Sequence, residues 1–386
     1  MPDLAMSLVP STRLADRIAA LRVRLSDEDL EALLVTHQAN IFYLSNVKAS
    51  AGVLLVGKDS VSLIIDARYV AAVRALVEAE STCQGMVVVQ VGSSYEETVL
   101  SALVKCGVGR VGIEADQMTV ASCDWFEGAL AGTGVRLCRT TGLVEAARMI
   151  KDSDELATMR EAGTLISTVM DKVLRELQVG RREREVAADI NSAIQNAGFD
   201  RPAFDTIVAT GPNTAFPHAR PSARKLASGD LVLLDFGGVY NGYCVDLTRM
   251  ASLGIPDTAA VSWHAAVSEA HAAAIGVVRP GVSASEVDAA ARTVLEQQGF
   301  GAAFGHGTGH GLGIEVHEAP RVGKRRSEGA LGADREDVEI KTGMVFTVEP
   351  GVYMPGYGGV RLEDDLIVTE DGHELLTGLA LDLFVV

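Results

Sequence analysis

Two acidic residues in the C-terminal part of this 386-residue chain each follow a run of apolar residues. Asp235 follows LVLL, and Glu349 follows MVFTV. A carboxylate at the end of a buried strand is unfavourable unless it is paired or binds a cation. Each is followed by a second acid, Asp246 in YCVDLTR and Glu363 in VRLEDD. The four acids together predict a carboxylate-rich metal site; the alternative is a structural role for all four.

The four acids belong to an internal repeat. Its helical part has an offset of 101 residues, which relates Gly180 to Gly281 and Gly198 to Gly299. Each copy predicts a helix with glycine before and after it, and Ser283 and Glu286 predict a capping box at the second helix. The strand segments 229–240 and 342–353 align with an offset of 114. The repeat places Asp235 opposite Glu349 and Asp246 opposite Glu363, which argues against chance similarity between two amphipathic helices.

A hairpin explains how two acids in one copy could meet. Asn241-Gly242 is a two-residue turn signal, so Tyr240 should face Tyr243. Asp246 would then lie opposite Gly237, on the same face as Asp235 and one diagonal step away, roughly 7–8 Å between backbones. Two carboxylates on one face repel each other unless a cation lies between them.

Histidines supply the other candidate groups. The glycine-rich stretch FGHGTGHGLGIEVHE contains His306, His310 and His317, and His218 lies in FPHARPS. Glycine permits close approach of the backbone, which favours metal binding or acid–base chemistry for the three histidines of this stretch. An isolated histidine such as His218 is more often structural. The stretch fits neither a G-x-G-x-x-G nucleotide loop nor an H-E-x-x-H zinc motif. Oxygen ligands with one histidine suit Mn²⁺, Co²⁺ or Fe²⁺, with Zn²⁺ as an alternative.

Composition excludes several other functions. The chain has 34 Lys and Arg against 51 Asp and Glu, a net charge of −17, which argues against a nucleic-acid partner. No run of 18 apolar residues predicts a transmembrane helix, and the N-terminus does not read as a signal peptide. The five cysteines form no C-x-x-C pair, which favours reduced thiols and a cytoplasmic location.

The order of patterns predicts two domains of mixed α/β class. Residues 1–142 alternate helical and strand patterns and contain no catalytic cluster. Residues 143–386 begin with a charged helical segment and contain the repeat. Within them, residues 321–343 are polar and predict a surface loop beside His317.

Several motifs, taken in order, resemble a known family. DFGGVYNGYCVDLTR, HGTGHGLGIEVHE, TVEPGVY and GGVRLEDD are similar to the pita-bread metallopeptidases, in their Xaa-Pro aminopeptidase and prolidase branch. The resemblance implies a creatinase-like α/β N-terminal domain followed by a pita-bread catalytic domain with a pseudo-two-fold repeat. The segment 321–343 looks longer than the usual connector of that family, either as a tolerated insertion or as an edge of the pocket.

The resemblance also implies roles for nine residues. Two divalent metal ions, most usually Mn²⁺ with Co²⁺ or Zn²⁺ as alternatives, would be held by Asp235, Asp246, His310, Glu349 and Glu363. Glu349 would also act as general base. His218 and His317 would contact substrate and move protons, and His306 and Arg361 would help to form the pocket.

The resulting hypothesis is hydrolysis of the Xaa-Pro bond at the N-terminus of short peptides or in dipeptides, by a hydroxide bridging two metal ions. Homodimers are common in the family, so a homodimer is expected. Two alternatives remain: a metal-dependent hydrolase of a non-peptide C–N bond in a small molecule, and a non-catalytic relative that binds a protein partner.

Overall fold

The computed structural model describes residues 9–325 and 337–386 of the chain. The chain divides between Arg148 and Met149 into two compact units, whereas the sequence predicted a boundary between residues 142 and 143. The short helix α6 (Glu145–Arg148) accounts for the difference, because it belongs to the first unit.

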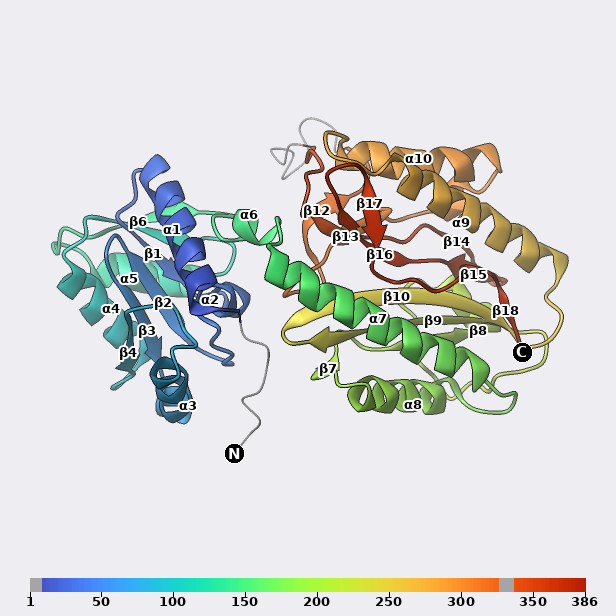
Figure 1. The fold of residues 1–386 in the computed structure, drawn as a ribbon, viewed down its shortest axis with the longest axis horizontal. Coiled ribbons are helices and arrows are strands. Elements are labelled where there is room, and N and C mark those ends of the chain that lie inside the picture. Colours follow the sequence, from blue (N-terminus) through green and yellow to red (C-terminus); the bar gives the residue numbers. More distant parts are fainter. Residues whose placement is uncertain (1–8, 326–336) are drawn as a thin grey trace. The chain divides into compact units, whose positions relative to one another are not determined.

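The first unit is a mixed six-stranded sheet with helices, in the strand order β4-β3-β2-β1-β5-β6 (Figure 1). One part of its core consists of apolar side chains from the central strands and from α4 and α5. Besides α6, the elements of this unit are α1 (Ser11–Asp27), β1 (Ala32–Val35), α2 (Gln38–Ser45), β2 (Val53–Gly57), β3 (Val61–Ile65), α3 (Ala67–Glu78), β4 (Met86–Gln90), α4 (Tyr95–Cys106), β5 (Arg110–Glu114), α5 (Val120–Ala129) and β6 (Arg136–Thr140).

The second unit contains two five-stranded sheets and a two-stranded ribbon. One sheet has the order β18-β10-β9-β7, with β8 also paired to β9, and the other has the order β12-β11-β13-β16-β17. The helices are α7 (Ser153–Arg175), α8 (Glu183–Asn196), α9 (Thr258–Val277) and α10 (Ala284–Gln297), with the 3₁₀ helices η1 (Gly211–Ala215) and η2 (Gly301–Ala303). The strands are β7 (Arg201–Pro202), β8 (Ile207–Thr210), β9 (Leu231–Tyr240), β10 (Tyr243–Ser252), β11 (Gly309–Gly311), β12 (Glu318–Val322), β13 (Val345–Val348), β14 (Gly351–Met354), β15 (Gly358–Arg361), β16 (Asp364–Val368), β17 (His373–Leu375) and β18 (Phe384–Val385).

The repeat predicted from the sequence is present in this unit. Helices α8 and α10 start 101 residues apart and have 14 residues each. Gly180 and Gly281 precede them with φ of 90° and 89°, in the left-handed region that glycine tolerates. The capping box of Ser283 and Glu286 is confirmed. Strands β9 and β13 start 114 residues apart, as the aligned segments predicted.

The predicted hairpin is also confirmed. Strands β9 and β10 are antiparallel, Tyr240 pairs with Tyr243, and Asp246 pairs with Gly237. Asn241 and Gly242 form the turn with φ of 50° and 92°, as a tight two-residue hairpin requires. This register places Asp235 and Asp246 on one face of the sheet.

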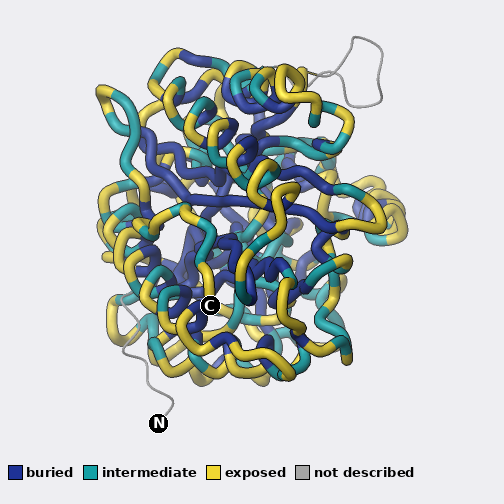
Figure 2. The backbone as a smooth tube through the Cα atoms, turned by 90° about the vertical axis from the view of Figure 1, so that its right-hand side faces the viewer, coloured by how far each residue is buried: buried dark blue, intermediate teal, exposed yellow. Residues whose placement is uncertain are grey.

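Burial follows the strands. The residues of β9 and β10 are buried along nearly the whole length of both strands. In Figure 2, exposed residues (yellow) lie mainly in coils and loops of the tube, and extended stretches are mainly dark blue, which marks buried residues. Helix α7 packs against both strands, and α9 and α10 pack against each other. The two halves of the repeat meet at an isolated antiparallel bridge between Thr248 and Glu363.

Other sequence predictions concern cysteines, membranes and the polar loop. All five cysteines are free thiols. In the described ranges 9–325 and 337–386, no helix is long and apolar enough to cross a membrane. Of the predicted loop 321–343, residues 326–336 lie outside the described residues, while β12 extends to Val322.

Close packing of α7 leads to a testable prediction. A Cβ atom at Gly163 would overlap the carbonyl oxygen of Leu376 and lie 2.9 Å from its carbonyl carbon. We expect Gly163→Ala to lower the free energy of unfolding by about 1–3 kcal/mol, because neither backbone can yield easily. The measurement is urea unfolding of the purified variant.

Gly276→Ala in α9 is the matched control. A Cβ there would have no neighbour within 4 Å. Since alanine is the better helix former, this variant should be unchanged or more stable by up to about 1 kcal/mol. Equal effects of the two substitutions would contradict the packing argument.

Candidate metal centre

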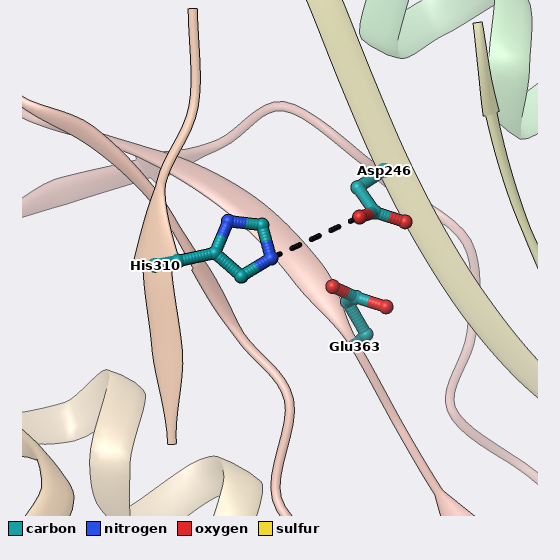
Figure 3. Close-up of side chains that lie close together, drawn as sticks. All are labelled: Asp246, His310 and Glu363. Carbon is teal, nitrogen blue, oxygen red and sulfur yellow. Dashed lines mark ion pairs between the residues drawn. The ribbon is translucent and has the colours of Figure 1, made fainter. Parts of the chain in front are cut away.

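Three predicted ligands lie together in the second unit. Asp246 of β10, His310 of β11 and Glu363, between β15 and β16, each offer a ligand atom within 4.8 Å of the others (Figure 3). The Nε2 atom of His310 lies 4.0 Å from Oδ2 of Asp246. Asp246 and Glu363 are buried, and His310 is half-buried. The side chains converge from three separate strands or strand ends, so the tertiary fold creates the site.

The other two predicted ligands adjoin this group. Oε1 of Glu349 lies 3.8 Å from Nε2 of His310. Asp235 lies one diagonal step from Asp246, and its carboxylate accepts a hydrogen bond from Arg361. Thr248, which pairs with Asp235 across the hairpin, donates its hydroxyl to Glu363 at 2.5 Å. The five residues therefore surround one buried region.

The carboxylates of this region have strongly perturbed acidities. Burial, and then the neighbouring carboxylates Glu363 and Asp235, raise the pKa of Asp246 well above its ordinary value. Burial and Glu363 have the same effect on the pKa of Glu349. Burial raises the pKa of Glu363 to about 8, and Asp235 adds to the rise. Without a cation, these groups could not all be ionised at neutral pH.

Two oxygen atoms provide a direct test of whether a cation fits. Oδ1 of Asp235 and Oδ1 of Asp246 are both buried, and neither has a hydrogen-bond partner among the residues that the structure describes. A buried acceptor without a donor is costly, and a metal ion would satisfy it. The donor set of four carboxylates and one imidazole suits a hard or borderline divalent ion. The residues present therefore fit a metal centre.

His310 has the tautomer that a metal ligand needs. Its Nδ1 lies 3.1 Å from the carbonyl oxygen of Gly311, which can only accept, so Nδ1 carries the proton. Nε2 then presents its lone pair toward Asp246 and Glu363. Burial and the neighbouring His317 lower the pKa of His310 to about 4, which keeps the ring neutral at pH 7.

The remaining predicted residues line the same region. His306 Nε2 lies 3.0 Å from the hydroxyl of Tyr353, which accepts from Nη1 of Arg361 at 2.7 Å. The ring of His317 lies 4.3 Å from that of His310. Burial raises the pKa of Asp235, whereas the charges of Arg361, and then of His218 and His317, lower it. Both histidines are exposed, so solvent and a ligand can reach them.

Comparison with known proteins identifies the family of this chain. Residues 157–370 match "Metallopeptidase family M24", and residues 17–150 match the "Creatinase/Prolidase N-terminal domain". The chain belongs to metallopeptidase family M24. The predicted family and the predicted mixed α/β fold, with a pita-bread catalytic part, are thereby confirmed.

Several relatives match this chain over nearly their whole length. The chain is 32% identical to the uncharacterized peptidase YqhT of Bacillus subtilis, over 96% of this chain and 99% of that protein. Its structure is similar to that of the Xaa-Pro dipeptidase from Bacillus anthracis, with a TM-score of 0.88, 32% identity and coverage of 97% and 100%. The X-Pro aminopeptidase from Thermotoga maritima has a TM-score of 0.82 at 29% identity, with coverage of 94% and 100%.

Three residues of the M24 site were missed from the sequence. Thr248 could have been found, because the hairpin register pairs it with Asp235. Tyr353 gave no separate signal, since its role depends on a contact with His306 from a distant loop. Asp365 is completely buried, and one of its oxygens accepts the backbone N–H of Asp246 at 2.9 Å. The sequence signal that could have pointed to Asp365 was its position two residues after Glu363, in the motif VRLEDD.

The acidity of Glu363 predicts how the metal-free protein responds to pH. Its pKa of about 8 in the folded chain exceeds the value of about 4.3 for an unfolded glutamate. Between these values the folded state holds a proton that the unfolded state has lost. The stability contributed by this group is therefore present below about pH 4.3 and is lost as the pH rises toward 8.

We expect the melting temperature of the metal-free protein to fall between pH 5 and pH 8, and to fall less for Glu363→Gln, which cannot ionise. Saturating divalent metal should reverse the difference, because binding favours the deprotonated ligands. Scanning calorimetry over this range checks both expectations. Identical pH profiles for the metal-free wild type and variant would contradict the assignment.

Proposed function

We propose that the protein is a metal-dependent exopeptidase that hydrolyses the Xaa-Pro bond in dipeptides or at the N-terminus of short peptides. The observation that carries this proposal is the buried group of Asp246, His310 and Glu363 in a chain of the M24 family. Relatives with similar structures are named Xaa-Pro dipeptidase and X-Pro aminopeptidase. Those names supply the substrate class.

Five side chains would hold two divalent ions, with Mn²⁺ as the preferred metal and Co²⁺ or Zn²⁺ as alternatives. They are Asp235, Asp246, His310, Glu349 and Glu363. Metal ions bound there would lower the pKa of a coordinated water and balance the charge of the carboxylates. The unpartnered oxygens of Asp235 and Asp246 support this assignment.

Residues around these ligands would handle the proton and the substrate. Glu349, which is partly exposed, would accept a proton from the attacking water and return it to the proline nitrogen as the C–N bond breaks. His218 would donate a hydrogen bond to the carbonyl oxygen as negative charge develops on it. His317, whose ring lies 4.3 Å from that of His310, would orient or protonate the reacting groups.

Recognition of proline would depend on shape. The nitrogen of the scissile bond carries no hydrogen, so the pocket needs no acceptor for it. Arg361 donates to Asp235, to Tyr353 and to the carbonyl oxygen of Pro217 at 3.2 Å. His306 is held through Tyr353. These contacts would hold the side chains of Arg361 and His306 in fixed positions in the wall of the substrate pocket.

Activity on defined peptides tests the proposal. We expect protein loaded with Mn²⁺ to release free amino acid from Xaa-Pro dipeptides, from Xaa-Pro tripeptides or from both, and to leave Xaa-Ala dipeptides intact or nearly so. Chromatography of the released amino acids is the measurement. Cleavage of dipeptides alone indicates a dipeptidase, and cleavage of tripeptides indicates an aminopeptidase. If the loaded protein cleaves neither, the proline-peptidase proposal is wrong.

Metal content tests the ligand assignment independently of substrate. Asp246→Ala and His310→Ala should each lose at least one metal ion per chain, because each removes a ligand atom. Elemental analysis after dialysis is the measurement, and His373→Ala is the matched control, since that ring contacts the carbonyl oxygen of Val278. Full metal content in both ligand variants would be incompatible with the assignment.

A further inference from the structure

One exposed histidine of the site, His218, lies on a segment that has no α-helix or strand around it. Strand β8 ends at Thr210, η1 follows, and His218 lies in the turn after it. Its side chain is exposed, so packing does not fix its position. A group that stabilises a developing charge must nevertheless be held within a fraction of an ångström. Something else must hold the segment.

The carboxylate of Glu183 binds both ends of this segment. Glu183 is the first residue of α8 and is completely buried. Its Oε1 accepts from the backbone N–H and the hydroxyl of Thr210, both at 2.8 Å. Its Oε2 accepts from the N–H of Ser222 at 2.9 Å and from its hydroxyl at 2.6 Å. The amide of Asn213 donates to both oxygens, at 3.0 and 3.2 Å.

These bonds make the position of the segment costly to change. A buried carboxylate without donors is strongly unfavourable, and hydrogen bonds to a charged acceptor are about twice as strong as neutral ones. Every hydrogen bond that the described part of the structure gives this carboxylate comes from residues 210–222. A shift of the segment would therefore remove several of them together. The far side of the segment is fixed by Arg361, which donates to Pro217.

The other half of the repeat uses the same device. Asp288 of α10 is buried and accepts from the N–H and the hydroxyl of Thr308, at 3.0 and 2.9 Å. Arg292, paired with Asp288 at 2.9 Å, donates to the carbonyl oxygen of His306 at 2.8 Å. In each half, a buried carboxylate on the helix of the repeat holds a segment with a site histidine. The two carboxylates are not equivalent in the repeat, because the 101-residue offset relates Glu183 to Ala284.

We propose that Glu183 is a positioning residue for His218. It acts through the segment 210–222, without touching the substrate, and sets the distance of the imidazole from Asp235. This inference rests on the role proposed above for His218. Asp288 and Arg292 hold His306 in the corresponding way, so Glu183 should be coupled to His218 and independent of His306.

The test is a double-mutant cycle with metal-loaded protein. Glu183→Gln keeps the shape of the side chain, but its NH₂ group faces donors. We expect kcat on the best Xaa-Pro peptide to fall about 10- to 100-fold, with KM little changed. His218→Ala should lower kcat about 100-fold by removing the hydrogen bond to the oxyanion.

The combination of variants separates positioning from general damage. In the His218→Ala background, Glu183→Gln should lower kcat by less than about twofold. The reason is that Glu183 acts on kcat through His218, so the effects of the two substitutions are not additive. In the His306→Ala background, it should keep its full effect. The same fold loss in all three backgrounds, or no loss in the wild type, overturns the inference. So does an unchanged kcat in His218→Ala.

Hydrogen exchange gives a readout that needs no activity. Backbone amides of residues 211–221 should exchange faster in Glu183→Gln, with metal content unchanged. Asp189→Asn is the matched control on the same helix, because its side chain is 64% exposed and pairs with Arg181 at the surface. Unchanged exchange in residues 211–221 overturns the inference, whatever the substrate proves to be.

A milder variant covers the case in which Glu183→Gln does not fold. Ser222→Ala removes one hydroxyl donor to Glu183. It should lower kcat by a smaller factor and show the same dependence on His218. An effect of Ser222→Ala that persists in the His218→Ala background overturns the inference equally.

Discussion

Repulsion between buried carboxylates is the constraint on which the second unit depends. The charge of Glu363 raises the pKa of both Asp246 and Glu349, and the charge of Asp235 raises the pKa of Glu363. Burial makes this worse, because the low dielectric weakens the screening of like charges. Arg361 relieves part of the repulsion through its bond to Asp235. The remaining repulsion must be relieved by protonation of the acids or by bound cations. With cations bound, all these acids can be ionised at neutral pH.

Such a cluster needs a rigid support, because each acid would otherwise turn toward solvent. The support is the pairing of β9 with β10 in one half and of β13 with β16 in the other. Arg249, which is almost completely buried, donates to the carbonyl oxygen of Glu363 at 2.6 Å and to that of Thr248 at 3.0 Å. It also pairs with Asp364 at 2.6 Å. The strands that carry ligands from the two halves are therefore bonded to each other directly beside the site.

The parts of this arrangement that follow from local rules could be predicted from the sequence. The turn at Asn241-Gly242 fixes the register of the hairpin, so the pairing of Asp246 with Gly237 could be counted from the sequence. The repeat supplied the second pair of acids in the same way. Tyr353 and the bond between Arg361 and Asp235 could not be predicted, because these contacts join segments far apart in the chain.

The site therefore divides its tasks between two kinds of structure. The proposed metal ligands lie mainly on or beside paired strands, where backbone hydrogen bonds fix their geometry. Histidines that would meet the substrate lie on segments with little regular structure, where a ligand can reach them. Such segments are mobile unless buried polar groups hold them, and Glu183, Asp288 and the buried pair of Lys151 with Glu318, next to His317, do so here. Precision in the loops thus depends on carboxylates that never contact the substrate, and substitutions there should change catalysis without changing the ligands.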